Sequence, residues 1–312
     1  MNLKLYIATL KRYIRIIFFY LKKYKLNNDQ EINGNTVYFI IDSELNHPGL
    51  ADRLKAICCC YYIAKTNNFE FKLIFEYPFQ LTDYLVPNKI DWKATKEELS
   101  FSLHNSRLLE YNPLKPIPTL DHRIKQYHIY FYTGKNILQC NNIKNWETIW
   151  ASCYNALFKP SIQLQNILNN QKFPPKSYIA VHFRFINILE NFEAADTNKI
   201  SQNDKNNLIQ KCINKLYEIQ ASTTKPIIVF SDSTTFLQIV RQNNFNTLEG
   251  EIEHISFSKD KASYLKTFLD FYMIGLADVI YRVTSNELYE TAFSMYAAIA
   301  NRRPFITLKL NQ

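Results

Sequence analysis

The chain has 312 residues, of which 47% are hydrophobic and 21% are charged, and its formal net charge is +9. This length suits two domains better than one compact core, and the composition excludes a disordered chain and a collagen-like repeat. Seven Lys or Arg residues and no Asp or Glu fall within the first 25 positions, so the remaining sequence is nearly neutral. The charge distribution therefore argues against nucleic acid as a partner.

The cysteines predict buried side chains rather than a metal centre or a disulfide framework. The six cysteines include no CxxC pair and no Cys/His spacing typical of a zinc site. Three of them, at positions 58–60, fall in a predicted helix, where consecutive side chains point in different directions and cannot bind one metal together. Free thiols fit a reducing cytoplasm, which is the location we expect.

Residues 1–30 predict a basic amphipathic helix. At about 100° per residue, one face carries an apolar stripe and another carries basic residues. The stripe consists of Leu3, Ile7, Leu10, Ile14, Ile17 and Leu21, and the basic face of Lys4, Lys11, Arg15 and Lys22. Two interpretations remain open: residues 1–25 lie on the anionic cytoplasmic face of a membrane, or the helix docks on its own domain. A membrane span is not expected because Arg15 interrupts the apolar run.

The first half of the chain begins with a βαβ unit. Short apolar runs predict strands over residues 36–41 and 71–75, and a helical pattern covers residues 50–65. Between residues 76 and 138 prolines and aromatic residues predict irregular loops that face an acceptor. A further helix is expected over residues 145–170.

The second half starts after a break at residues 172–177 and repeats the alternation of strands and helices. The expected strands are 178–183, 226–230, 254–256, 279–283 and 304–308, and the expected helices are 202–220, 234–242, 262–276 and 287–301. We therefore predict an α/β protein with domains at residues 31–171 and 172–312.

Polar residues stand at the carboxyl ends of several predicted strands, where open α/β sheets bind ligands. Gly49 lies in the turn from the first strand into the helix that follows, a helix N-terminus that can hold phosphate. His182 and Arg184 lie two residues apart at the end of a buried strand, and Asp232 follows the next strand in a Ser-Asp-Ser turn. The alternatives are an ordinary turn, a surface pair and a helix cap, respectively.

Residues 269–296 are a fourth segment with polar residues near predicted strand and helix ends, after those at Gly49, at His182 and Arg184, and at Asp232. The four segments together form a recognisable pattern. The run GLADRL after the first strand, HxR at the start of the second half, SD after the next strand, and D…LADVI…TSNE near the end resemble the fucosyltransferase superfamily in order and approximate spacing. That superfamily includes α-1,6-fucosyltransferases, protein O-fucosyltransferases and bacterial α-1,2 enzymes. The resemblance implies a GT-B fold of two Rossmann-like domains, a GDP-fucose donor, and inverting transfer without a metal or other cofactor.

The resemblance also implies roles for individual residues. It assigns Arg184 to the β-phosphate, which suits the planar guanidinium, and His182 to the nucleoside side of the pocket. Asp270 matches the aspartate that binds the edge of guanine, and Ser285 and Asn286 match the phosphate-binding turn before the last helix. Asp278 in LADVI is expected to be structural.

The chain departs from the family pattern at three positions. Asn187 replaces the final aspartate of HxRxxD, Phe185 stands where many members carry Arg or Gly, and Asp52 stands where an asparagine is usual. These differences leave the donor sugar more open than the GDP group. They also make Asp52 our first candidate for the catalytic base, although an acid at a helix start is the ordinary alternative.

The expected activity is transfer of a sugar from a nucleotide-sugar donor, GDP-fucose first, to a glycan hydroxyl in bacterial surface polysaccharide or lipopolysaccharide synthesis. The acceptor of such an enzyme can be lipid-linked. Three further residues are candidate bases behind Asp52, namely His47, Glu44 and Glu190. The alternatives are a GT-B transferase with another nucleotide sugar, or a basic membrane-binding or nucleic-acid-binding protein without catalysis.

Overall fold

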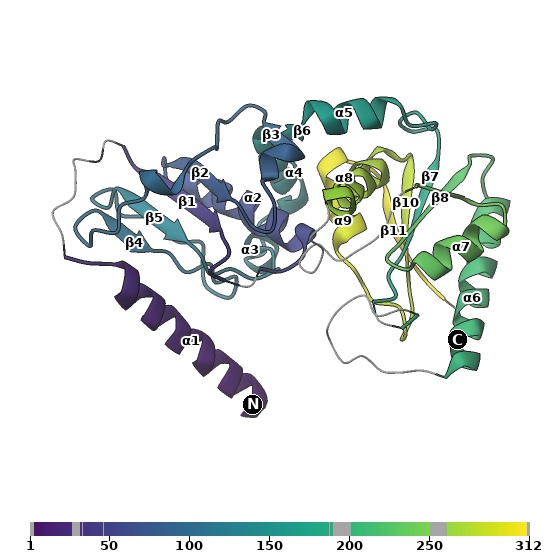
Figure 1. The fold of residues 1–312 in the computed structure, drawn as a ribbon, viewed down its shortest axis with the longest axis horizontal. Coiled ribbons are helices and arrows are strands. Elements are labelled where there is room, and N and C mark those ends of the chain that lie inside the picture. Colours follow the sequence, from purple (N-terminus) through teal and green to yellow (C-terminus); the bar gives the residue numbers. More distant parts are fainter. Residues whose placement is uncertain are drawn as a thin grey trace.

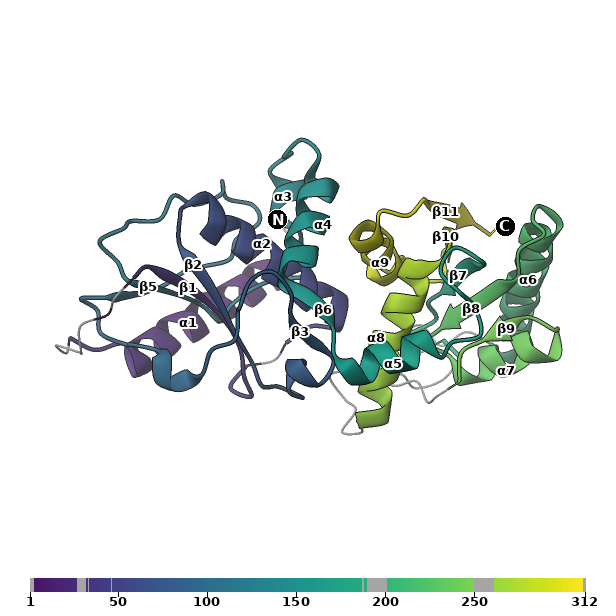
Figure 2. The same ribbon diagram turned by 90° about the horizontal axis from the view of Figure 1, so that it is seen from above.

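A computed structural model describes residues 3–26, 32, 34–45, 47–186, 188–189, 201–249 and 261–310, with residues 3–12 described by their backbone alone. Within these ranges the chain forms two parallel sheets with helices packed between them and outside them (Figures 1 and 2). The expected strand 254–256 lies outside the described residues. The predicted α/β class is confirmed.

The first sheet has four parallel strands in the order β2-β1-β5-β4. These strands are β1 (Thr36–Ile41), β2 (Glu70–Phe75), β4 (Ser106–Leu108) and β5 (Gln126–Ile129). The β1 strand alternates between two cores: Phe39 belongs to the core on the side of helix α2 (Leu50–Thr66), whereas Tyr38 belongs to a smaller core on the other side. Both faces of this sheet are therefore covered, as parallel sheets require.

The second sheet has five parallel strands in the order β11-β10-β7-β8-β9. The strands are β7 (Ile179–Phe183), β8 (Ile227–Ser231), β9 (Asn246–Thr247), β10 (Val279–Thr284) and β11 (Phe305–Lys309). Its outer face packs against helices α6 (Gln202–Ala221) and α7 (Thr234–Gln242). Its inner face packs against α8 (Lys261–Leu276) and α9 (Phe293–Asn301).

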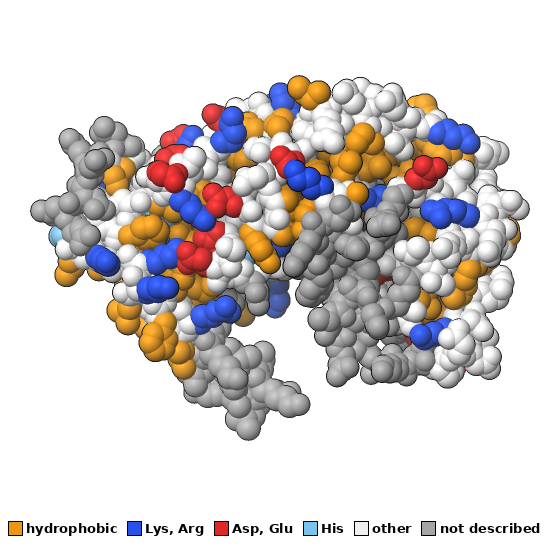
Figure 3. All heavy atoms as spheres, viewed as in Figure 1, with side chains coloured by type: hydrophobic (Ala, Val, Ile, Leu, Met, Phe, Trp, Pro, Cys, Tyr) orange, Lys and Arg blue, Asp and Glu red, His pale blue; other side chains and the backbone are white. Residues whose placement is uncertain are grey.

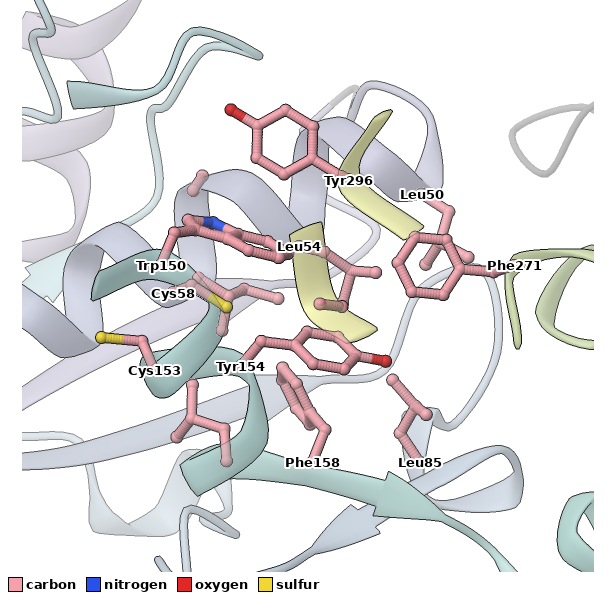
Figure 4. Close-up of a cluster of buried hydrophobic side chains, with 14 of the residues drawn as sticks. Leu50, Leu54, Cys58, Leu85, Trp150, Cys153, Tyr154, Phe158, Phe271 and Tyr296 are labelled. Carbon is pink, nitrogen blue, oxygen red and sulfur yellow. The ribbon is translucent and has the colours of Figure 1, made fainter. Parts of the chain in front are cut away.

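One continuous hydrophobic core joins the two halves. It contains residues of α2 and α4 (Trp146–Leu157) from the first half and of α8 and α9 from the second half. In Figure 4, Leu54 of α2 lies in the middle of the cluster, with Trp150 and Tyr154 of α4 on one side and the side chains of Tyr296 and Phe271 above it and on the other side. Each of these aromatic side chains is nearly fully buried. Burial of apolar surface contributes about 25 cal/mol per Å², and this contribution holds the two halves together. We retain residues 31–171 and 172–312 as proposed domains on this shared core.

Helix α1 (Leu3–Lys23) docks on the outer core of the first sheet through its last turns. The ring of Phe19 lies 4.6 Å from that of Tyr130, and Lys23 forms a 2.8 Å ion pair with Glu44. Tyr24, directly after the helix, is buried and its hydroxyl lies 2.8 Å from Nδ1 of His128. None of the described helices is long and apolar enough to cross a membrane.

Three expectations about the elements were wrong. The region 76–138 contains strands β4 and β5, and β5 lies in the middle of the first sheet. The helix expected over residues 145–170 is two helices, α4 and α5 (Ile162–Asn169), separated by the short strand β6 (Phe158–Pro160), which pairs with β3 (Leu85–Pro87). Proline has no N–H donor, which explains the interruption at Pro160. The last helix begins at Phe293 and not near residue 287.

Candidate functional site

A cleft of about 890 Å³ lies where the two halves meet, at the carboxyl ends of β7 and β8 and the N-termini of α2 and α9. The loop after β5 and one side of α8 complete its walls. Six of the residues singled out from the sequence line it together, namely Gly49, Asp52, His182, Arg184, Asp232 and Asp270. Parallel sheets and helix N-termini place backbone N–H groups and polar side chains in such a cleft.

Arg184 is held in place by Asp232. Nε of Arg184 lies 3.3 Å from Oδ2 of Asp232, and the Arg184 side chain keeps a fifth of its surface exposed. The Asp232 carboxylate also accepts hydrogen bonds from the backbone N–H groups of Phe185 at 2.8 Å and Ile186 at 2.7 Å. Burial raises the pKa of Asp232, and the nearby Arg184 and the two N–H donors oppose this rise. Asp232 therefore orients the turn that carries Arg184.

The backbone at Ile186 adopts an uncommon conformation beside this pair. Its φ angle is +54°, a left-handed value that a β-branched residue rarely takes. The carboxylate of Asp232 binds the N–H of this residue, which helps to stabilise the conformation. The turn after β7 is thus fixed by the buried side chain of Asp232, which directly follows the neighbouring strand β8.

His182 is a buried, neutral imidazole on the wall of the cleft. Burial lowers its pKa to about 3, and the guanidinium groups of Arg184 and Arg282 act in the same direction. Its Nδ1 atom has no hydrogen-bond partner among the described residues. A neutral histidine with one unpaired nitrogen can exchange a hydrogen bond with a ligand.

Asp270 projects from α8 into the cleft and is paired with Lys266 one turn earlier. Nζ of Lys266 lies 2.6 Å from Oδ1 and 2.7 Å from Oδ2 of Asp270, and both side chains are buried. Burial raises the pKa of Asp270, and the ammonium of Lys266 opposes this rise. A ligand that binds this carboxylate would have to share it with Lys266.

Asp52 enters the cleft from the first turn of α2. Its Oδ1 atom lies 2.5 Å from Nζ of Lys55, and its side chain is more than a third exposed. The loop after β5 approaches so closely that a Cβ atom added at Gly134 would lie 2.4 Å from Cγ of Asp52. A side chain at position 134 would therefore have to displace the carboxylate of Asp52. Gly49 has φ −62°, which any residue can adopt, and it caps α2 without a side-chain hydrogen bond.

The N-terminus of α9 is a part of the site that the sequence analysis missed. Thr291, Ala292 and Phe293 line the cleft. Ala292 makes no side-chain cap, and the hydroxyl of Thr291 accepts the N–H of Phe293 at 3.1 Å. Arg282 of β10 holds the preceding segment through hydrogen bonds to the carbonyl of Thr291 at 2.8 Å and to Oε1 of Glu290 at 2.5 Å. The threonine directly before the apolar run of α9 was the available signal for this helix start.

Several predicted residues lie elsewhere. Ser285 and Asn286 line a different hollow, beside α6, where the Ser285 hydroxyl accepts the N–H groups of Glu287 and Leu288. Ser285 and Asn286 were predicted to lie directly before the last helix, but α9 starts only at Phe293, so they do not lie at its N-terminus. Asp278 forms a 2.6 Å ion pair with Lys225 near the surface.

Two of the candidate bases behind Asp52, Glu44 and His47, are not among the described residues that line the cleft. Glu44 forms an ion pair with Lys23 of α1. The ring nitrogens of His47 contact the carbonyl of Asp42 at 2.8 Å and the hydroxyl of Tyr132 at 3.1 Å. Burial lowers the pKa of His47 to about 4. Glu190 and Asn187 lie outside the described residues.

The cleft combines groups that suit a phosphorylated ligand. The N-termini of α2 and α9 supply backbone N–H donors, and Arg184 supplies a fixed cation. Asp52 and Asp270 supply carboxylates at separate places in the wall. The described residues contain no group of three or more His, Cys, Asp or Glu side chains arranged to bind a metal ion.

Comparison with solved structures gives the same overall fold. FUT1 from Arabidopsis thaliana, solved with GDP, superposes with a TM-score of 0.54 at 12% identity over 96% of this chain and 75% of that one. The α-1,6-fucosyltransferase NodZ, solved with GDP-fucose, superposes with a TM-score of 0.53 at 13% identity over 86% of this chain and 93% of that one. NodZ has also been solved from Bradyrhizobium without a named ligand, at a TM-score of 0.52 and 12% identity over 85% and 93% of the chains.

The sequence itself gives no such match. No protein-family model and no curated protein sequence matches the chain. At these identities the structural likeness establishes the fold and nothing finer. The chain has the GT-B fold that these fucosyltransferases share.

Proposed function

We propose that the protein is a glycosyltransferase that uses a GDP-sugar, with GDP-fucose as the first candidate donor. One observation carries the proposal: Arg184, fixed by Asp232, lies in the same cleft as the N-termini of two helices. A diphosphate placed there would meet a guanidinium fork and two sets of backbone N–H groups. The fold shared with structures solved with GDP and GDP-fucose supports the same donor.

Asp270 is the proposed guanine-reading residue. A carboxylate can accept hydrogen bonds from both N–H groups on the edge of guanine, whereas uracil and adenine do not present this pair of donors. Asp270 projects into the cleft from α8, a position compatible with this role. The pairing with Lys266 implies that the base shares the carboxylate with an ammonium that neutralises it.

The proposed reaction is a direct displacement with inversion at the anomeric carbon. The acceptor hydroxyl forms the new bond to that carbon while the bond to the β-phosphate oxygen breaks, and GDP leaves with the electron pair. Arg184 and the helix N-termini stabilise the charge that builds on the departing diphosphate. The proton of the acceptor hydroxyl passes to the carboxylate of Asp52, which Lys55 orients. The proposed reaction uses no metal.

The proposed acceptor is a glycan, with surface polysaccharide, lipopolysaccharide and their lipid-linked precursors as the first compounds to screen. The first half of the chain would bind this acceptor. It contributes the loops between residues 76 and 138, which include the loop at residues 133–135. Gly134 of this loop lies beside Asp52 of α2, so an acceptor hydroxyl near Asp52 would also contact the loop.

The test is a comparison of thermal stabilisation by GDP, UDP, ADP and CMP at equal concentration. A ligand that binds the native state raises its stability by about 2.7 kcal/mol at a concentration 100 times its dissociation constant. We expect GDP to give the largest shift, and Arg184→Ala to remove most of it. The matched control is Arg123→Ala, which removes an exposed arginine that pairs with Asp121 and is not among the described residues lining the cleft. A larger shift with UDP would refute the GDP assignment, and an undiminished GDP shift in Arg184→Ala would refute the role of Arg184 in binding the diphosphate.

A further inference from the structure

Helix α1 has one face attached to the protein. The ring of Phe19 packs against those of Tyr130 and Phe131, with centroid distances of 4.6 and 5.3 Å. Lys23, on the same side of the helix, forms an ion pair with Glu44 and lies over the ring of Phe101. Tyr24 completes the attachment through its contact with His128. These contacts fix the rotation of the helix relative to the sheet.

The opposite face of α1 is apolar and exposed. Ile14 is 44% exposed, Ile17 56%, and Phe18 and Leu21 69% each. At about 100° per residue these four side chains fall within an arc of roughly 100°, which is the width of a buried stripe on an amphipathic helix. Figure 3 shows hydrophobic side chains beside basic ones at the lower left, where α1 leaves the first half of the molecule. Isolated exposed apolar residues are ordinary, but a continuous stripe indicates a surface that is covered.

Basic residues flank this stripe. Arg15 and Lys22 are exposed, and the helical period places both next to the apolar arc on one side. The sequence continues the pattern toward the N-terminus, with Leu3, Ile7 and Leu10 on the arc and Lys4 and Lys11 beside it. Seven cations and no carboxylate occur in the first 25 residues.

We infer that this exposed face of α1 binds the surface of an anionic lipid bilayer. Apolar side chains flanked by cations match the acyl boundary and the anionic headgroups of such a surface. A second copy of the chain fits less well, because pairing the same faces would bring two sets of cations together without a compensating carboxylate. The inference does not depend on the proposed catalytic function, since none of the described side chains of α1, residues 13–23, lines the cleft.

The attachment also sets the orientation of the bound protein. Phe19 packs on the outer core of the first sheet, whereas α2 and the cleft belong to the other side of that sheet. A bilayer under α1 therefore leaves the N-terminus of α2 accessible.

The test measures cosedimentation of the full chain with two kinds of vesicle. One kind contains phosphatidylcholine alone, and the other also contains about 30% of the anionic lipid phosphatidylglycerol. We expect binding to the anionic vesicles, weaker binding at high salt, and weak binding to neutral vesicles. The Phe18→Glu/Leu21→Glu variant should bind at least about tenfold more weakly, because it removes two apolar side chains and adds two negative charges. Both positions are mostly exposed, so the fold should persist.

The matched control is Leu114→Glu/Ile162→Glu, which makes the same chemical change at two side chains that are 81% and 83% exposed elsewhere. It should bind vesicles like the unmodified protein. Absence of binding to anionic vesicles, or equal loss in both double variants, would overturn the inference. So would a dimer, seen by sedimentation, that only Phe18→Glu/Leu21→Glu dissociates. Thermal stabilisation by GDP in the same samples reports separately on the proposed function.

Discussion

Nε of Arg184 lies 3.3 Å from Oδ2 of Asp232, which also accepts the N–H of Ile186. This contact joins the carboxyl ends of two neighbouring strands, β7 and β8, and leaves part of the guanidinium exposed to the cleft. The carboxylate of Asp232 restricts the conformations of the Arg184 side chain before any ligand binds. Such preorganisation is the means by which a fixed cation stabilises charge that develops during a reaction.

We predict that Asp232→Asn weakens nucleotide binding through Arg184. The amide keeps one oxygen acceptor but puts an NH₂ group where the second oxygen now meets Arg184 and a backbone N–H. The free energy of unfolding should fall by about 1–3 kcal/mol. The thermal shift caused by GDP should also fall, as in Arg184→Ala.

The control for Asp232→Asn is a variant that destabilises the same turn without reaching Arg184. Ser233 caps α7 by accepting the N–H of Phe236 at 3.0 Å, and Ser233→Ala should cost about 1 kcal/mol. It should leave the GDP shift intact. If both variants lose the GDP shift in proportion to their loss of stability, Asp232 has no separate role in positioning Arg184.

A second prediction concerns Asp270 and the preference for guanine over uracil in the bound nucleotide. Removing Asp270 alone would leave the Lys266 ammonium buried without a counter-charge, which destabilises proteins strongly. The informative variant is therefore Lys266→Met/Asp270→Asn, which removes both charges and keeps the volume. The ratio of dissociation constants for UDP and GDP should fall by about ten- to a hundredfold, since a paired hydrogen bond to a base edge contributes about 1–3 kcal/mol.

Calorimetry with GDP and UDP measures this ratio directly. Asp278→Asn is the matched control, because Asp278 pairs with Lys225 near the surface and lies outside the described cleft lining. It should keep the preference of the unmodified protein. An unchanged ratio in the Lys266→Met/Asp270→Asn variant would mean that another group reads the base.

A third prediction tests Asp52 as the proton acceptor. Asp52→Asn should lower turnover by at least about a hundredfold, the usual contribution of a general base, while the GDP shift stays unchanged. Gly134→Ala should act in the same direction, because its Cβ would lie 2.4 Å from Cγ of Asp52 and would displace the carboxylate. The side chain can move, so this variant should fold.

Release of GDP from GDP-fucose, in the presence of a glycan acceptor found by screening, reports the turnover. Asp91→Asn, an exposed aspartate outside the described cleft lining, is the control and should leave the rate unchanged. Full turnover with a normal pH profile in Asp52→Asn would remove this residue from the mechanism.

The sequence predicted those parts of the fold and site that depend on local pattern. The strand at residues 36–41 and the helix at 234–242 were predicted with the bounds that the structure has, because an apolar run and an amphipathic period mark them clearly. Arg184 and Asp232 were found for a related reason, since polar residues directly after buried strands are conspicuous. Their ion pair was not predicted, because it depends on the register between β7 and β8.

The parts that were missed depend on tertiary contacts. Strand β5 has only four residues, and it forms because β1 and β4 supply partners on both sides. The start of α9 was placed too early because residues 285–290 suit a helix, whereas Arg282 holds Glu290 and Thr291 in another conformation. The close approach of Gly134 to Asp52 joins segments more than 80 positions apart, which no local pattern reveals.

The last prediction is that acid destabilises the protein through three buried histidines. Burial lowers the pKa of His47 to about 4 and the pKa values of His128 and His182 to about 3. The unfolded chain has histidines with a pKa of about 6.5, so below this pH it binds protons that the folded chain does not. Stability present above pH 6.5 is therefore lost as the pH falls toward 4, by up to about 1.4 kcal/mol per pH unit for each histidine.

His128 offers the cleanest variant for this measurement. Its Nε2 atom lies 3.0 Å from Oε1 of Gln126, which accepts a hydrogen bond, so Nδ1 accepts the proton of the Tyr24 hydroxyl and the ring is neutral. His128→Gln can keep a donor and an acceptor there without titrating. Urea unfolding at pH 7.0 and 5.5 should show a difference of several kcal/mol in the unmodified protein, about a third smaller in His128→Gln. His104→Gln, at an exposed position, should leave the difference unaltered. An equal pH dependence in His128→Gln would show that His128 does not contribute to the response to acid.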